Sequence, residues 1–332
     1  MKFDAVLPPM PLKNVPKVAC AAEEMGFDTL WTTETQHDAF LPHPLIANST
    51  SKINMGTAIA ISFARSPGDM AYTAWDLAAQ SEGRFILGLG TQVKGHITKR
   101  FGMPWPDSVV GKLREQIGAI RALWNTWQIG EKLRYSGEYY KLRLMTPFFN
   151  PGKIAHPDIP IYIAGVNTGL ARLAGEICNG FHAHPFNTPR YLEEILIPAI
   201  EEGASKTNRS RKDVAISLTA FIATTPEEAN QARMQIAFYA STPSYKRVMD
   251  LYGWGDTAEK LRNHVAKGEW SEMPMLITDE MLEEFVTYAD SPADLPAALK
   301  KRYAGMVDRI TIYTPFLPGE KDDFWKKMVG AF

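Results

Sequence analysis

The chain has 332 residues, of which 45% are hydrophobic and 22% charged, and its formal net charge is -1. This is the composition of an ordinary globular protein, and it gives no electrostatic reason to bind nucleic acid or an anionic membrane. No apolar run approaches the roughly 18 residues that span a bilayer, and the N-terminal segment lacks the apolar core of a signal peptide. The two cysteines, Cys20 and Cys178, match no zinc or redox motif. We therefore expect a reduced, cytoplasmic protein without a metal site.

Short apolar runs alternate with amphipathic segments along the chain. Strands are expected, in chain order, at residues 3–7, 28–31, 53–61, 85–89, 159–165, 180–184, 215–223 and 308–313. Helices are expected at residues 16–25, 44–51, from Pro67 onward, at 109–127, 167–178, 189–202, 226–240, 292–303 and at the C-terminus. Thr225 is the expected N-cap of the helix at 226–240. Residues 133–142 are typical of a hairpin with Ser136 and Gly137 in its turn, and residues 241–287 of irregular helices.

Repeated alternation of strand and helix indicates parallel strands, and eight such repeats favour a closed barrel. The expected fold class is α/β, a (β/α)₈ TIM barrel with insertions after strands 4 and 7. No proline- or serine-rich linker divides the sequence, so residues 1–332 are expected to form a single domain. An open, doubly wound sheet is the alternative.

The segment ILGLGTQVKG, residues 86–95, tests whether the chain binds a dinucleotide. The fingerprint for that function is G-x-G-x-x-G at a turn from strand to helix. Gly88 and Gly90 have the first spacing, but Val93 stands at the third glycine position. The loop is also expected to continue to about residue 106 before a helix begins. We interpret the segment as the fourth barrel strand, where the glycines either admit a flat ligand or relieve crowding in the core.

Two long segments resemble signatures of the bacterial luciferase-like superfamily of flavin and deazaflavin oxidoreductases. They are ARSPGDMAYTAWDLAAQSEGRFILGLGTQ (residues 64–92) and IPIYIAGVNTGLARLAGEICNGF (residues 159–181), with RFGMPW (residues 100–105) between them. The resemblance covers nearly the whole chain and implies a barrel with its cofactor at the C-terminal mouth, in a homodimer. The overall likeness is closest to the branch that uses coenzyme F420, a deazaflavin that exchanges a hydride.

The segment AGVNTG, residues 164–169, follows a strand and opens a helix, where backbone N–H groups and the helix dipole favour an anion. An N-cap without a ligand is the alternative. In the family this loop holds the cofactor's phosphate, so the resemblance gives that role to Gly165, Val166, Asn167 and Thr168. His184 is a candidate for a second phosphate contact, whereas His182, two residues earlier in the strand, is expected in the core.

The third and fourth strands resemble the part of the family fold that supports the cofactor ring. By position, the resemblance implies a non-prolyl cis peptide bond between Ala58 and Ile59, behind the ring system. Thr91, just past the fourth strand, is expected near the ring. Val93 and His96 are expected to line the loop beyond it, with His96 hydrogen-bonded to the ribityl chain.

Acid and base candidates follow the second strand in the segment TTETQHD. A hydride acceptor such as a ketone, an imine or an activated alkene needs a proton donor nearby, and Glu34 and His37 are the expected catalytic residues. Glu34 alternatively pairs with a neighbouring cation, and His37 alternatively belongs to an exposed loop.

One departure from the family pattern bears on the substrate. Members that oxidise glucose 6-phosphate carry an Asp-His pair after strand two and a Glu soon after the Thr of strand four. The matching places here are Glu34-Thr35 and Val93, which disfavours a sugar-phosphate dehydrogenase. Four aromatic residues are expected at the mouth and suggest a rather apolar small-molecule substrate: Phe40, Phe63, Trp105 and Phe186.

Three functions compete at this point. The first is an F420-dependent oxidoreductase that transfers a hydride between the deazaflavin C5 and an organic substrate. The second is an FMN-dependent monooxygenase that works with a separate flavin reductase. The third is a protein that binds or stores the cofactor without catalysis.

Overall fold

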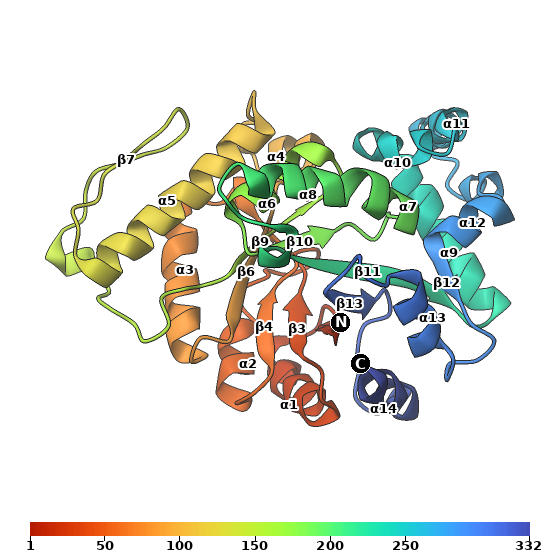
Figure 1. Ribbon diagram of the computed structural model, residues 1–332, viewed down its shortest axis with the longest axis horizontal. Helices are drawn as coiled ribbons and strands as arrows, with labels where there is room; N and C mark the ends of the chain where they lie inside the picture. The colour runs from red at the N-terminus through yellow and green to blue at the C-terminus, as the bar shows by residue number, and fades with distance from the viewer. The chain divides into compact units, whose positions relative to one another are not determined.

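The computed structural model describes all residues from 1 to 332, which form two compact units. We call residues 6–164 the N-terminal unit and residues 1–5 with 165–332 the C-terminal unit. Both units are built from parallel strands that alternate with helices, as the sequence pattern predicts (Figure 1). The assignment of the whole chain to one domain stays a prediction.

The sheet of the N-terminal unit is parallel throughout. Its strands follow the order β3 (Thr29–Thr32), β4 (Asn54–Thr57), β6 (Phe85–Gly90) and β9 (Ile161–Gly165), and the short β5 (Ala60–Ile61) also pairs with β6. Every residue of β3 and β6 is buried. Such continuous apolar strands are typical of parallel sheets that are covered on both faces.

The N-terminal unit also contains helices and one hairpin. These are α1 (Val15–Met25), α2 (His43–Ser49), α3 (Pro67–Gln80), α4 (Lys94–Lys99), α5 (Val109–Ile129), the hairpin of β7 (Tyr135–Ser136) and β8 (Lys141–Leu142), and the 3-10 helices η1 (Leu12–Asn14), η2 (Ser62–Ala64) and η3 (Pro147–Phe149). The Ser66 hydroxyl accepts a hydrogen bond from the Asp69 N–H at 3.0 Å, which caps α3 and sets its start. Gly26 ends α1 in the left-handed conformation, with a φ of 94°.

The sheet of the C-terminal unit is also parallel. Its strands follow the order β1 (Lys2–Phe3), β13 (Arg309–Ile312), β11 (Ala215–Ala223) and β10 (Gly180–Ala183). β11 extends beyond its two neighbours, and β12 (Val286–Tyr288) pairs with this extension (Figure 1). β2 (Ala5–Val6) lies at the boundary between the units in the sequence.

The remaining helices belong to the C-terminal unit. They are α6 (Thr168–Ile177), α7 (Pro189–Tyr191), a π turn η4 (Leu192–Leu196), α8 (Ile197–Ser205), α9 (Pro226–Ala240), α10 (Lys246–Asp250), α11 (Gly255–Lys267), α12 (Asp279–Phe285), α13 (Leu295–Arg302), α14 (Asp322–Ala331), and the 3-10 helices η5 (Arg211–Asp213), η6 (Pro243–Tyr245) and η7 (Met273–Leu276). The Thr225 hydroxyl caps α9, as predicted, by accepting the Glu228 N–H. No helix of the chain is both long and apolar enough to cross a membrane.

Four local expectations are wrong. The strand at 3–7 is two short strands separated at Asp4, whose carboxylate pairs with Arg309. The strand at 53–61 is divided into β4 and β5. A strand, β12, lies in the segment expected to be helical, because pairing with β11 takes precedence over local preference. Cys178 follows α6 as its C-cap instead of lying inside the helix.

The hairpin turn and the loop after β6 also differ from expectation. Residues 137–140 connect β7 and β8, because the Glu115 carboxylate accepts the backbone N–H groups of Glu138, Tyr139 and Tyr140. A helix, α4, begins four residues after β6, although its sequence contains Gly95 and no capping side chain. Ile97, which is fully buried, accounts for this helix through packing.

Candidate functional site

Glu34 lies in the loop after β3 and is one of the two expected catalytic residues. Its carboxylate is engaged at both oxygens. Oε2 accepts the backbone N–H of Ile61 at 2.6 Å and Nη1 of Arg65 at 2.8 Å, while Oε1 accepts Nη2 of Arg65 at 2.7 Å. The side chain is only 6% exposed. The structure therefore shows the pairing with a cation that was the alternative to a proton-donor role, and the catalytic role of Glu34 stays a prediction.

Arg65 joins this loop to the end of β5. Its guanidinium also contacts Asp38 at 2.5 Å and donates to the Ile61 carbonyl at 3.2 Å. Burial alone would lower the pKa of Arg65, but the hydrogen bonds and charges of Glu34 and Asp38 raise it, so the guanidinium stays charged. We call Glu34, Asp38 and Arg65 the arginine clamp. It holds the loop after β3 against the backbone of Ile61.

β5 and β6 bring together several residues that the resemblance assigns to the ring system. The peptide bond between Ala58 and Ile59 is cis, as the resemblance implies. A Cβ on Gly90 would lie 2.5 Å from Cγ1 and Cδ1 of Ile59, so Gly90 makes room for this side chain. The Thr57 hydroxyl donates to the Gly88 carbonyl at 2.6 Å. At Gly90 the structure thus shows relief of crowding in the core.

Gly90 and Gly95 give a matched pair of substitutions within one segment. We expect Gly90→Ala to lower the free energy of unfolding by about 1–3 kcal/mol, because the added methyl group overlaps Ile59. Gly95→Ala meets no atom within 4 Å and lies in α4, so it should be neutral or stabilise the fold by up to about 1 kcal/mol. Urea unfolding of both variants checks the pair. Equal changes in the free energy of unfolding for the two variants would contradict the packing role of Gly90.

The other residues expected around the cofactor ring lie after β6. Thr91 and Val93 are half-buried, and the N–H of Val93 is held by the side-chain oxygen of Gln92 at 2.9 Å. His96 is exposed and lies on α4 instead of an open loop. The contacts of these three residues with a cofactor stay predictions.

His37, the second expected catalytic residue, is exposed. It borders a cavity of about 30 Å³ that is also lined by Leu7, Met10 and Leu12. The imidazole is therefore accessible, and its role as a proton donor stays a prediction.

The sequence alone does not reveal a buried pair that supports the same loop. The Thr32 hydroxyl donates to the Ala39 carbonyl at 2.8 Å and lies 2.9 Å from Nε2 of His43. Burial lowers the pKa of His43 to about 3, so its imidazole is neutral. Because the Thr32 proton is given to the Ala39 carbonyl, Nε2 of His43 carries the hydrogen and donates it to Thr32. Together, Thr32 and His43 hold the far end of the loop that carries Glu34 and His37.

In the C-terminal unit, the loop after β9 opens α6 without a side-chain cap. Asn167 occupies the N-cap position with extended backbone, yet its side chain accepts no hydrogen bond from the helix. Its Nδ2 instead donates to the Ser244 carbonyl at 3.0 Å. Tyr191 donates to the Val166 carbonyl at 3.1 Å, and a Cβ on Gly165 would lie 2.9 Å from Cβ of Leu170. The loop is thus fixed from both sides, while the first N–H groups of α6 lack a side-chain acceptor.

The two histidines of β10 and its following loop differ as predicted. His182 is buried, whereas His184 is half-buried at the end of the strand. Burial lowers the pKa of His184 to about 3, and its Nδ1 accepts the Phe186 N–H at 3.0 Å. The proton of neutral His184 is therefore on Nε2, which makes this atom a donor. A neutral donor suits a phosphate oxygen or another acceptor.

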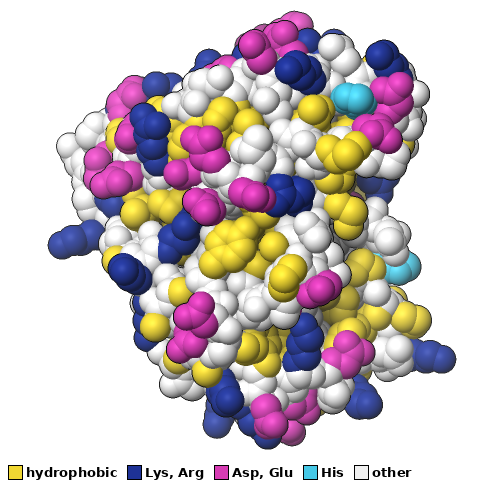
Figure 2. Space-filling model, turned by 90° about the vertical axis from the view of Figure 1, so that its right-hand side faces the viewer, with side chains coloured by type: hydrophobic (Ala, Val, Ile, Leu, Met, Phe, Trp, Pro, Cys, Tyr) yellow, Lys and Arg dark blue, Asp and Glu magenta, His cyan; other side chains and the backbone are white.

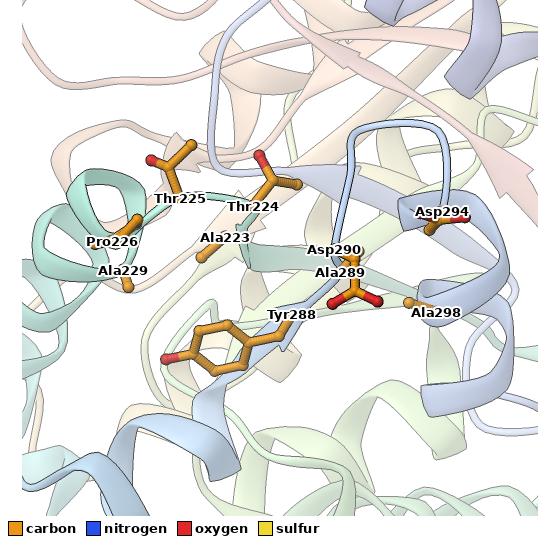
Figure 3. Close-up of a pocket in the computed structure, with 10 residues that line it drawn as sticks. All are labelled: Ala223, Thr224, Thr225, Pro226, Ala229, Tyr288, Ala289, Asp290, Asp294 and Ala298. Atoms are coloured by element: carbon orange, nitrogen blue, oxygen red, sulfur yellow. The ribbon is translucent and has the colours of Figure 1, made fainter.

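A cavity of about 500 Å³ lies elsewhere in the C-terminal unit, at the end of β11 (Figure 3). Thr224, Thr225 and Tyr288 line it together with Asp290 and Asp294. Thr225 is occupied in capping α9, and the Thr224 hydroxyl donates to Glu228 at 2.9 Å. None of the residues expected to bind a cofactor lines this cavity, so we do not assign it to the active site.

Three of the four aromatic residues expected at the mouth lie in the core. Phe63 and Phe186 are at most 1% exposed and Phe40 is 8% exposed, while Trp105 is half-buried. The ring of Phe186 stacks on Phe285 at 4.7 Å. Burial of large apolar side chains stabilises the fold, so these rings give no argument about the substrate.

Repeated parallel strand–helix units, with polar residues at the carboxyl ends of the strands, define a barrel-type α/β enzyme class. The sequence profile of the luciferase-like monooxygenase family matches residues 3–309, and the chain belongs to this family. An uncharacterized protein of Mycobacterium tuberculosis is 41% identical over 317 residues, covering 93% of this chain and 92% of the relative. The F420-dependent glucose-6-phosphate dehydrogenase of Nakamurella multipartita is 30% identical over 291 residues and covers 82% of each chain.

Solved structures show the fold. The coenzyme F420-dependent tetrahydromethanopterin reductase of Methanopyrus kandleri matches with a TM-score of 0.79 at 22% identity, covering 99% of this chain and 97% of that chain. The oxygenating constituent of 3,6-diketocamphane monooxygenase from Pseudomonas putida, solved in complex with FMN, matches with a TM-score of 0.65 at 18% identity, covering 100% and 96%. The chain accordingly has the α/β TIM-barrel fold, and its family includes both F420-dependent and FMN-dependent oxidoreductases.

Proposed function

We propose that this protein is an F420-dependent oxidoreductase that acts on a small organic substrate. The observation that carries the proposal is the uncapped N-terminus of α6, where Asn167 turns its amide away from the helix. Free N–H groups at a helix N-terminus bind phosphate, which both deazaflavin and flavin mononucleotides carry. The 30% identical relative that is F420-dependent favours the deazaflavin over FMN.

The residues present fit such a cofactor in each unit. In the C-terminal unit, Asn167 keeps a second amide hydrogen for a phosphate oxygen, and His184 offers Nε2–H. In the N-terminal unit, Gly90 leaves space for Ile59, which the resemblance places behind the ring. When bound, F420 supplies or accepts a hydride at C5. The arginine clamp then serves to fix the loop that carries His37, our candidate for the proton donor.

Titration of the purified protein with F420 and with FMN tests the cofactor assignment. We expect F420 to bind at micromolar concentration or below, with a change in its fluorescence, and FMN to bind more weakly. Micromolar FMN binding without F420 binding would support the second function, an FMN-dependent monooxygenase. Tight F420 binding without turnover of a broad substrate panel would support a binding or storage protein.

Thr168→Glu tests residues 165–168, which we call the phosphate loop, without weakening the helix. Thr168 is the first residue of α6, where a negative charge favours the helix dipole. We expect stability to be unchanged or slightly higher, but F420 affinity to fall at least about tenfold, because the carboxylate repels the phosphate. Thr257→Glu, in the first turn of α11, is the matched control and should leave affinity unchanged. An unchanged affinity in Thr168→Glu would remove the phosphate role from this loop.

The homodimer that the resemblance implies stays a prediction, as does the cytoplasmic location. Size-exclusion chromatography with light scattering would determine the oligomeric state.

A further inference from the structure

Three tyrosines that the sequence did not single out surround or lie near His184 in the C-terminal unit. The hydroxyl oxygens of Tyr239 and Tyr313 are 2.7 Å apart. The ring of Tyr239 contacts His184 edge-on at 4.7 Å, and the ring of Tyr245 lies 4.6 Å from His184. We call Tyr239, Tyr245, Tyr313 and His184 the tyrosine cluster.

The position of the tyrosine cluster follows from the strands. Tyr313 and His184 each follow the last residue of a parallel strand, β13 and β10 respectively. β11 lies between these two strands and extends past both, and α9 then returns so that Tyr239, near its C-terminus, reaches the two strand ends. In barrels of this class, reacting and binding groups lie at the carboxyl ends of strands.

Contacts within the same unit connect the tyrosine cluster to the phosphate loop. Asn167 donates to the Ser244 carbonyl, and Ser244 precedes Tyr245 on η6. Tyr245 contacts His184, which contacts Tyr239. A continuous series of contacts, through the backbone of Ser244 and the rings of the cluster, thus leads from the uncapped N-terminus of α6 to Tyr313.

The two phenols of Tyr239 and Tyr313 share one hydrogen bond, in which either oxygen can be the donor. In the arrangement in which Tyr239 donates, the Tyr313 proton is left for a further acceptor. A hydrogen bond with the Gln235 side chain also acts on Tyr239. Burial raises the pKa of Tyr245 to about 12 and also raises that of Tyr313, so both phenols stay protonated near neutral pH. Tyr313 is 39% exposed and thus accessible to a ligand.

Tyr313 contacts two aromatic side chains, Phe221 and Tyr239. Its ring packs on Phe221 at a centroid distance of 4.7 Å, and His184 is neutral. Beyond Tyr239, the rings of Phe238 and Trp270 lie 6.4 Å apart and are about half exposed. Figure 2 views a side of the C-terminal unit and shows hydrophobic side chains at the surface among charges of both signs. A neutral phenol donor among aromatic side chains favours a neutral acceptor over a carboxylate or a phosphate, because an ionised group loses more hydration there.

We propose that Tyr313 binds the oxygen atom of an apolar carbonyl compound, and that this compound class is the substrate. The substrate part rests on the proposed function, because a carbonyl carbon is the hydride acceptor that such an oxygen donor would serve. Tyr239 and Gln235 act as positioning residues that orient the Tyr313 hydroxyl. The exposed rings of Phe238 and Trp270 supply apolar surface next to the cluster.

Binding of acetophenone and ethylbenzene tests the proposal, because the two molecules share a ring and differ in the oxygen. Calorimetry on the wild-type protein, with and without F420, should show tighter binding of acetophenone. Tyr313→Phe should weaken acetophenone binding about tenfold and leave ethylbenzene binding unchanged. Tyr239→Phe should have a smaller effect of the same kind, since Tyr313 keeps its own hydroxyl. Tyr288→Phe, an exposed tyrosine of β12, is the matched control and should change neither.

Infrared spectroscopy gives a second readout that does not depend on affinity. A hydrogen bond from Tyr313 should lower the carbonyl stretching frequency of bound acetophenone, and Tyr313→Phe should reverse this shift. The proposal is overturned if acetophenone does not bind, or if Tyr313→Phe changes the affinities for both molecules by the same factor. If F420 does not bind but Tyr313→Phe still weakens acetophenone binding selectively, the proposed function is overturned and the oxygen site remains.

Discussion

Replacing Arg65 with methionine is expected to lower the free energy of unfolding by about 3–5 kcal/mol. The guanidinium is 15% exposed and neutralises Glu34, whose side chain is 6% exposed. Without Arg65, the Glu34 carboxylate keeps the Ile61 N–H but has no cation to offset its desolvation. The loop after β3 would then release its contacts, and turnover should fall together with stability. Urea unfolding and steady-state kinetics measure the two effects.

A double substitution separates the charge from the contacts of the arginine clamp. Glu34→Gln combined with Arg65→Met removes both charges of the buried pair. We expect the double variant to be more stable than Arg65→Met alone, because no uncompensated buried charge remains. A double variant that is no more stable than Arg65→Met would show that the carboxylate is not the source of the loss. Turnover that survives in the double variant would also assign Glu34 to positioning instead of proton transfer.

Replacing Asp4 with asparagine is expected to lower the free energy of unfolding by a similar amount, about 3–5 kcal/mol. Asp4 has no exposed side-chain surface, and its two oxygens accept Nε and Nη2 of Arg309 at 2.8 and 2.7 Å. The pair joins the first residues of the chain to the start of β13, across 305 positions of sequence. An amide in place of the carboxylate keeps the shape but removes the negative charge of Asp4 next to the buried Arg309 guanidinium. Urea unfolding measures the loss.

The surface ion pair of Arg190 and Glu194 is the control for Asp4. Its members are one helical turn apart, 2.9 Å at closest approach, and each is 48% exposed. Glu194→Gln should leave the free energy of unfolding almost unchanged, because water screens the pair. If Asp4→Asn lowered the free energy of unfolding no more than Glu194→Gln does, burial of the ion pair would not explain the loss.

Several residues of the candidate site could be placed from the sequence, because their roles depend on local geometry. Thr91 is half-buried just after β6, and Asn167 occupies the N-cap of α6, since strand ends and helix starts are set by residues within a few positions. The cis bond between Ala58 and Ile59 followed from the resemblance of the third strand to the family pattern. The placement of His182 in β10 and of His184 just after it followed from the two-residue period of a strand.

The partners of the same side chains could not be predicted. Glu34 pairs with Arg65, 31 positions away, and Tyr239 with Tyr313, 74 positions away. Tyr313 ends a predicted strand and could have been proposed from that position, whereas Tyr239 and Tyr245 offered no such signal. The hairpin turn was misplaced for the same reason, since Glu115 on α5 holds its backbone.

The sequence by itself determined the order of strands and helices, the parallel α/β class and the family, because these depend on periodicity and on signatures that are continuous in the chain. The tertiary structure alone decided which groups are charged or neutral and which of them form hydrogen bonds or ion pairs. It placed a guanidinium on both oxygens of Glu34, made His184 a neutral donor, and joined Tyr313 to Tyr239. The physical reason is that desolvation and hydrogen bonding act through space, between residues whose separation in the sequence carries no signal.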